Sequence, residues 1–218
     1  MIMKKKAIIF DMGEVLVDLD LKACRDAFIR DLGFSAIDEI LDACHQKGIW
    51  GEMEAGNLSA EEFRACVIKD SRRGVTPQEV DEAVWKILVG VAPEKITLLK
   101  RMSERYDLYM LSNNNPICHP KAGEMFAEAG FPLDEGFVKC YMSYQMKALK
   151  PSEEFYKTVL ADMGRPVEEL LFVDDSQSNV DGALAAGLPA VYYEPGTDLG
   201  RVLAEALGDP SILEQEAV

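Results

Sequence analysis

Four short, continuous runs of apolar residues predict four buried β-strands. They are AIIF at residues 7–10, DLYML at 107–111, LLFV at 170–173 and PAVYY at 189–193. None of them alternates apolar with polar positions, and continuous runs are typical of strands that are covered on both faces. The pattern therefore predicts a parallel sheet between two layers of helices.

The segments between the later runs carry the apolar spacing of amphipathic helices. One helix is expected to begin at Pro93, another at Pro151, and a third is expected over residues 179–186. Gly187 follows the third helix, where a helix often ends with a positive φ. Because strands and helices alternate, the sequence predicts an α/β fold with a Rossmann-like parallel sheet core and helices on both faces.

A long insertion separates the first predicted strand from the second. Its amphipathic helical stretches lie at residues 21–33, 37–48, 59–70 and 77–90. A single crossover helix needs only a fraction of this length. We therefore expect a small α-helical cap domain at residues 19–91, inserted into a core that consists of residues 1–18 and 92–218.

Composition narrows the range of partners. The formal net charge is −15, which repels phosphate backbones, so we expect no nucleic-acid partner, although a local site can still bind a small anion. No segment approaches the roughly 20 apolar residues of a membrane helix, so no membrane association is expected. The five cysteines include no CxxC pair, which favours reduced thiols in a cytoplasmic protein.

Polar side chains stand where the predicted strands end. The residues at these ends are Asp11, Ser112, Asn113, Asp174 and Asp175, and Lys150 stands just before a predicted helix. In an open parallel sheet, ligands bind outside the carboxyl ends of the strands. We therefore expect these side chains to converge on one rim of the sheet.

The residue types indicate what this rim can do. Carboxylates that lie close together repel one another, and Mg²⁺, which prefers oxygen ligands, relieves that repulsion. A carboxylate such as Asp11 can attack phosphorus and form an aspartyl phosphate. Ser112 and backbone N–H groups can hold phosphoryl oxygens, while Lys150 can contact the phosphoryl group and keep Asp11 ionised.

The order of these residues resembles the four motifs of the haloacid dehalogenase superfamily. The matching residues are Asp11-Met-Gly13, Ser112-Asn113, Lys150-Pro151 and Asp174-Asp175 followed by Asn179. The resemblance covers essentially the whole chain, including the helical insertion. The first motif, Asp-x-Gly-x-Val, is similar to that of a bacterial subgroup that includes alpha-D-glucose-1-phosphate phosphatase-like proteins.

The resemblance implies a role for each residue. Asp11 would be the nucleophile, Lys150 would orient it, and Ser112 and Asn113 would bind the phosphate. Mg²⁺ would be held by Asp11, Asp175 and the backbone carbonyl of Gly13, with Asp174 either as a further ligand or as a partner behind the ligands. The implied activity is Mg²⁺-dependent hydrolysis of a small phosphorylated metabolite, such as a sugar phosphate, by a monomer or homodimer.

One position departs from the pattern of most phosphatases in the superfamily. They carry aspartate two residues after the nucleophile as general acid and base, whereas this sequence has Gly13. Such a group typically contributes about 10²–10⁴-fold in rate. The neighbouring carboxylates Glu14, Asp18 and Asp20 could substitute, although Asp18 and Asp20 could equally shape the turn into the cap.

The same absence leaves alternatives open. Dehalogenases and phosphonoacetaldehyde hydrolases of the superfamily also lack that aspartate. Dehalogenases need no metal, so the acidic pair Asp174-Asp175 argues against that reading. Phosphonatases need a Schiff-base lysine in the cap, and none of Lys22, Lys47, Lys69 and Lys86 stands in a context typical of one. A non-catalytic binding module on the same fold is the remaining alternative.

The loop-like stretch GIWGEMEAG is the candidate for substrate selection. It contains Trp50, Glu52 and Glu54 within the predicted cap. A cap loop that faces the core would contact substrate, which makes Glu54 a candidate substrate-binding residue. The alternative is an ordinary turn between helices in which Trp50 packs inward.

Overall fold

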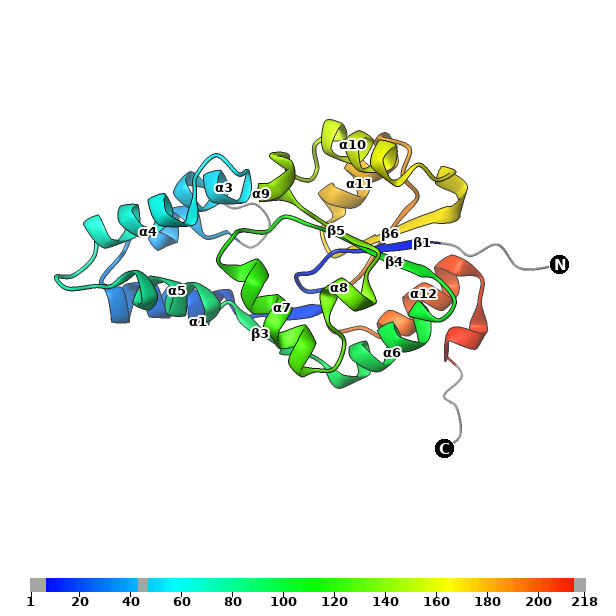
Figure 1. Ribbon diagram of the computed structural model, residues 1–218, viewed down its shortest axis with the longest axis horizontal. Coiled ribbons are helices and arrows are strands. Elements are labelled where there is room, and N and C mark those ends of the chain that lie inside the picture. The colour runs from blue at the N-terminus through cyan, green and yellow to red at the C-terminus, as the bar shows by residue number, and fades with distance from the viewer. Residues whose placement is uncertain (1–6, 43–46, 214–218) are drawn as a thin grey trace.

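A five-stranded parallel sheet forms the centre of the larger lobe of the molecule (Figure 1). The computed structural model describes residues 7–42 and 47–213. The sheet has the order β5-β4-β1-β6-β7. Its strands are β1 (Ala7–Phe10), β4 (Asp107–Ser112), β5 (Lys139–Met142), β6 (Leu170–Asp174) and β7 (Ala190–Tyr192).

Helices cover both faces of this sheet, as the apolar runs predict. Alternate residues of β1 enter different clusters: Ile8 and Phe10 pack with the helices on one face, and Ala7 and Ile9 pack with those on the other. The first face carries α6 (Pro93–Ser103), α7 (Cys118–Glu128) and α12 (Leu199–Leu207), and the second carries α10 (Glu153–Met163) and α11 (Gln177–Ala185). The α/β fold class is therefore confirmed.

Short elements join these helices and strands. They are α8 (Leu133–Gly136), α9 (Ser143–Met146), and the 3₁₀ turns η2 (Val167–Glu169) and η3 (Pro210–Leu213). The expectation of four strands was incomplete, because β5 also joins the sheet. Lys139 at the start of β5 is exposed and Cys140 is only partly buried, so this edge strand lacks the continuous apolar run of the others.

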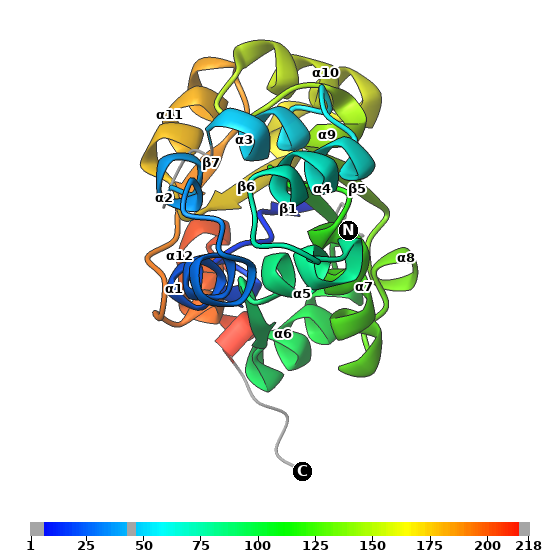
Figure 2. The same ribbon diagram turned by 90° about the vertical axis from the view of Figure 1, so that its left-hand side faces the viewer.

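A smaller helical lobe lies beyond one end of the sheet (Figures 1 and 2). It contains α1 (Leu21–Ala27), the π-helical turn η1 (Phe28–Leu32), α2 (Ile37–Ile40), α3 (Gly48–Glu54), α4 (Ala60–Lys69) and α5 (Pro77–Trp85). The lobe has an apolar cluster of its own, in which the Trp50 ring lies 5.8 Å from Phe63 and 6.2 Å from Phe28. Capping boxes at Ser59 and Thr76 begin α4 and α5.

Two of the expected element types in this lobe were wrong. The stretch GIWGEMEAG is largely helix α3, because Trp50 and Met53 lie three residues apart and both turn into the apolar cluster. The helix predicted for 77–90 ends at Trp85, and Leu88–Val91 is strand β3. The helix predicted for 37–48 ends at Ile40, and residues 43–46 lie outside the described residues.

The two chain crossings between the lobes pair with each other. Strand β2 (Val17–Leu19) is antiparallel to β3 (Leu88–Val91). Lys95 at the start of α6 lies 2.7 Å from Asp18, which ties this ribbon to the core. The predicted partition, with a cap at 19–91, would cut the chain inside or beside this ribbon, and it stays a prediction.

Two further observations concern the chain as a whole. In residues 7–42 and 47–213, no helix combines the length and the apolar character needed to cross a membrane. The described cysteines, Cys24, Cys66, Cys118 and Cys140, are free thiols, and Cys44 lies outside the described residues.

Candidate active site

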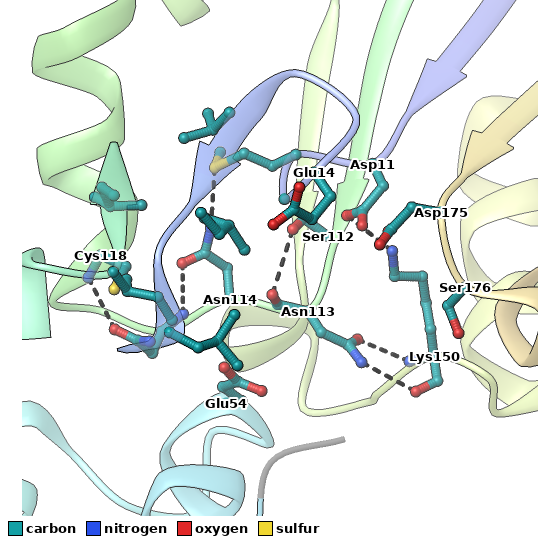
Figure 3. Close-up of a pocket in the computed structure, with 18 of the residues that line it drawn as sticks. Asp11, Glu14, Glu54, Ser112, Asn113, Asn114, Cys118, Lys150, Asp175 and Ser176 are labelled. Atoms are coloured by element: carbon teal, nitrogen blue, oxygen red, sulfur yellow. Dashed lines mark hydrogen bonds and ion pairs between the residues drawn. The ribbon is translucent and has the colours of Figure 1, made fainter. Parts of the chain in front are cut away.

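The carboxyl ends of three neighbouring strands open into one pocket. Asp11 follows β1, Ser112 ends β4, and Asp175 follows β6, while Lys150 reaches the same place from the loop before α10. The pocket has a volume of about 370 Å³. Figure 3 shows Asp11 and Asp175 close together, with the Lys150 side chain extending toward them.

Lys150 is buried between two carboxylates. Its Nζ lies 2.9 Å from Asp11 Oδ1 and 2.6 Å from Asp174 Oδ2, and only 2% of the residue is exposed. Burial opposes the ammonium charge, but the charges of Asp11 and Asp174 outweigh it and raise the pKa of Lys150. Lys150 is therefore a fixed cation that holds the Asp11 carboxylate in place.

Three carboxylates crowd the same end of the pocket. Asp11, Asp174 and Asp175 each offer an oxygen, and these oxygens lie within 4.8 Å of one another. Burial, opposed by Lys150 and aided by Asp174, raises the pKa of Asp11 to about 6. Burial, followed by the charges of Asp11 and Asp174, raises the pKa of Asp175 to about 7. A compact oxygen donor set with this excess of negative charge fits a hard divalent cation.

The three carboxylates are not equivalent. Asp174 is fully buried, and its oxygens accept hydrogen bonds from Lys150 Nζ, the backbone N–H of Ser176 and Asn179 Nδ2. Asp175 is only partly buried and lines the pocket. Asp174 thus fixes the groups around it, while the Asp175 carboxylate stays available to a ligand.

Asn113 binds the backbone of Lys150 with its side chain. Lys150 N–H donates to Asn113 Oδ1 at 2.8 Å, and Asn113 Nδ2 donates to the Lys150 carbonyl at 3.0 Å. Beside it, Ser112 is buried and its hydroxyl has only a long contact, 3.3 Å, to the Asn113 carbonyl. The Ser112 hydroxyl is free to turn toward a ligand, whereas the Asn113 amide is engaged.

The loop after Asp11 turns tightly beneath the pocket. The backbone N–H groups of Leu16 and Val17 both donate to the Met12 carbonyl, and Gly13 and Glu14 line the pocket. Glu14 has a φ of 55°, which is uncommon for a residue other than glycine. A larger residue at Gly13 would place its Cβ 3.0 Å from Leu19 Cδ1.

The carboxylates Asp18 and Asp20 have structural partners. Asp18 pairs with Lys95, and Asp20 accepts a hydrogen bond from the backbone N–H of Ala23 at the start of α1. Neither residue lines the pocket. Both therefore shape the entry into the helical lobe.

Glu54 enters the pocket from the helical lobe. It ends α3, and its Oε1 accepts a hydrogen bond of 2.8 Å from the indole N–H of Trp50. Burial raises the pKa of Glu54 to about 7. Trp50 both packs inward and borders the pocket, whereas Glu52 is exposed and lies outside it.

Two residues that position this site, Ser143 and Asn115, were not among the site residues predicted from the sequence. Ser143 is fully buried and connects the lobes: its hydroxyl donates to the Glu54 carbonyl at 2.6 Å and accepts from Asn114 N–H at 2.9 Å. Asn115 caps α7 through the N–H groups of Ile117 and Cys118. The run of three asparagines after Ser112 was a signal of a structured turn, but the Ser143 contact joins residues 89 positions apart and left no local pattern.

Comparison with known proteins agrees with this geometry. A family model described as haloacid dehalogenase-like hydrolase matches residues 5–187. A D-ribitol-5-phosphate phosphatase from Bacteroides thetaiotaomicron is 35% identical over 198 residues, which cover 88% of this chain and 94% of the relative.

Solved structures of similar proteins have the same architecture. A HAD family enzyme from Bacteroides thetaiotaomicron, in complex with magnesium and inorganic phosphate, has a TM-score of 0.82 at 32% identity and covers 89% of this chain and 97% of its own. A predicted HAD-like family hydrolase from Porphyromonas gingivalis has a TM-score of 0.83 at 31% identity, covering 93% and 98%. The resemblance seen in the four motifs is confirmed, and the chain belongs to the haloacid dehalogenase-like hydrolase family.

Proposed function

We propose that this protein is a Mg²⁺-dependent phosphatase that hydrolyses a small phosphomonoester through an aspartyl phosphate on Asp11. The observation that carries the proposal is the buried pairing of Asp11 with Lys150 beside Asp174 and Asp175, at one pocket. A nucleophilic carboxylate, a fixed cation and an acidic pair are the groups that phosphoryl transfer to a carboxylate requires.

The chain's own residues divide the work. The Asp11 carboxylate attacks phosphorus, and Lys150 holds that carboxylate in one orientation and balances its charge. The Ser112 hydroxyl and backbone N–H groups of the loop after Asp11 hold phosphoryl oxygens. Asp174 holds the side chain of Lys150 in place, and Asn113 holds its backbone.

The metal site is proposed at the same carboxylates. Asp11, Asp175 and the Gly13 carbonyl would hold Mg²⁺, with Asp174 directly behind them. When bound, the cation supplies charge neutralisation to the phosphoryl group. The proposal rests on the crowding of Asp11 and Asp175, whose pKa values are raised mainly by burial, and on the magnesium complex of a similar HAD family enzyme.

The substrate is proposed to be a sugar or polyol phosphate. A relative with this substrate class covers most of the chain, and the pocket behind the phosphate end combines apolar walls with the carboxyl group of Glu54. Hydroxyl groups of such a substrate can hydrogen-bond Glu54, while Asn113 acts indirectly by holding the Lys150 backbone. Of the described lysines only Lys150 lines the pocket, so a Schiff-base phosphonatase is disfavoured.

Location and assembly follow the same proposal. Free thiols at the described cysteines agree with a cytoplasmic enzyme. A small phosphorylated metabolite is its only proposed partner, and the protein acts as a monomer or homodimer.

The first test is phosphate release from sugar phosphates, polyol phosphates, nucleotides and p-nitrophenyl phosphate, with Mg²⁺ and with chelator. We expect turnover of at least one sugar or polyol phosphate with Mg²⁺ and its loss with chelator, because the carboxylates repel without a cation. Restoring Mg²⁺ should restore activity. Turnover that is equally fast in chelator would contradict the metal-dependent mechanism.

A further inference from the structure

We propose that Glu54, from the helical lobe, is the group that protonates the leaving alkoxide and then deprotonates the water that hydrolyses the aspartyl phosphate. The inference rests on the proposed function and adds to it a catalytic residue. It also explains how the site could work with Gly13 at the position where most phosphatases of the superfamily have an acid.

The other described groups in the pocket are committed elsewhere. Asp11 is the nucleophile, Asp175 belongs to the metal site, and Lys150 is held as a cation by two carboxylates. An alkoxide is a poor leaving group, so its departure needs a proton donor within hydrogen-bond reach. Of the carboxyl groups that line the pocket in the described part of the chain, only Glu14 and Glu54 remain.

Glu14 and Glu54 differ in their position relative to Asp11. In-line attack by Asp11 puts the leaving oxygen on the side of phosphorus that faces away from Asp11. Glu14 is drawn beside Asp11 and Ser112 in Figure 3, on the nucleophile's side of the pocket. Glu54 ends α3 and stands across the drawn pocket from Asp11 (Figure 3). We therefore place the leaving oxygen on the side of Glu54.

The hydrogen bond from Trp50 decides which oxygen of Glu54 can carry a proton. An indole N–H is a donor only, so Oε1, which it contacts at 2.8 Å, must act as an acceptor. The proton of the neutral acid therefore sits on Oε2. Among the described residues, none forms a hydrogen bond with Oε2, so this oxygen is available to substrate or water.

Contacts with the core hold Glu54 at a fixed place relative to the phosphate end. Its carbonyl accepts from Ser143, which also accepts from the N–H of Asn114, two residues after Ser112. Gly56 brings the following chain against α9: a Cβ there would lie 2.3 Å from the Tyr144 carbonyl oxygen. A catalytic acid needs such support from its surroundings, because a small displacement lowers its efficiency.

The burial of the Glu54 carboxyl group also favours a role in acid–base catalysis. Burial is the main cause that raises the pKa of Glu54 to about 7, and the nearby charge of Asp11 adds to it. A carboxyl group with a pKa near the working pH can release a proton in one step and accept one in the next. The geometry and the protonation behaviour therefore point to the same residue.

Glu54 gives up one proton in the first step and regains one in the second. The bond from Asp11 oxygen to phosphorus forms, the bond from phosphorus to the substrate oxygen breaks, and the Glu54 Oε2 proton passes to that oxygen to give the free alcohol. Water then attacks phosphorus and gives a proton to Glu54, while the bond to Asp11 breaks. Inorganic phosphate leaves, and both carboxyl groups return to their starting states.

The test is Glu54→Gln, assayed on a sugar or polyol phosphate and on p-nitrophenyl phosphate. Glutamine keeps the oxygen that Trp50 binds and removes only the acid. Because p-nitrophenolate leaves without a proton, we expect kcat/KM, which reports phosphoryl transfer to Asp11, to fall about 10²–10⁴-fold on the alkyl ester and far less on p-nitrophenyl phosphate. Loss of the base for the second step should lower kcat on p-nitrophenyl phosphate and produce an initial burst of p-nitrophenolate. The matched control is Glu52→Gln, an exposed glutamate on the same helix, which should change neither substrate's kcat.

A second variant tests the positioning by Ser143. Ser143→Ala removes the contact that fixes the Glu54 carbonyl but leaves its carboxyl group, so a smaller loss with the same preference for the alkyl ester is expected. Melting curves of both variants report whether the fold is intact.

Three results would overturn the proposal. They are an equal loss of kcat/KM on both esters in Glu54→Gln, a rise in KM with kcat unchanged on the alkyl ester, or the ester-dependent loss of kcat/KM in Glu14→Gln instead. Absence of wild-type turnover on both esters would instead overturn the proposed function, and with it this assignment.

Discussion

Asp11→Asn is expected to abolish phosphate release, with kcat lower by about 10⁴-fold or more, the scale seen when a catalytic nucleophile is removed. Asparagine keeps the shape of the side chain and an oxygen that can accept from Lys150, which lies 2.9 Å from Asp11 Oδ1. It lacks the charge needed to attack phosphorus. The measurement is steady-state phosphate release with saturating Mg²⁺ on the best substrate of the panel.

The stability of Asp11→Asn separates loss of chemistry from loss of fold. The substitution removes one of three crowded carboxylates, and Lys150 still has Asp174 at 2.6 Å. The Tm in chelator should therefore stay level or rise. Asp18→Asn is the matched control, because Asp18 belongs to the same segment but pairs with Lys95 outside the pocket. Activity retained in Asp11→Asn would refute the covalent mechanism.

The core of the site was predictable because it depends on local patterns. Each continuous apolar run ends at a polar residue, and the ends of parallel strands meet at one edge of a sheet. That argument was sufficient to bring together Asp11, Ser112 and Asp175, which the structure finds around one pocket. Lys150 joined them only through the order of the motifs, since it lies on no strand.

The parts that were not predictable depend on contacts between distant segments. Strand β5 begins with an exposed lysine, and its place in the sheet is set by pairing with β4. Strands β2 and β3 stabilise each other and carry no strong pattern alone. Helix α3 contains two glycines, and its form follows from the burial of Trp50 and Met53 in the helical lobe.

The second large effect is expected when the cation beside the nucleophile, Lys150, is removed. In Lys150→Met, a buried cation is lost, and two carboxylates, Asp11 and the fully buried Asp174, lose the partner that balances them. Breaking a buried ion pair on one side typically costs about 3–5 kcal/mol. For a chain of this size that corresponds to a Tm lower by ~6–20 °C. Activity should fall at least about 10²–10³-fold, as for other preorganised charges.

A double variant shows whether Lys150 acts through charge or through chemistry. Lys150→Met with Asp174→Asn removes one cation and one buried carboxylate together, so much of the lost stability should return. Phosphate release should not return, because nothing then orients Asp11. Lys95→Met is the control for removing a lysine from a more exposed pair, worth only about 0–1 kcal/mol. If the double variant melts as low as Lys150→Met alone, the stability loss does not come from uncompensated charge, and the assignment of Lys150 as the balancing cation is wrong.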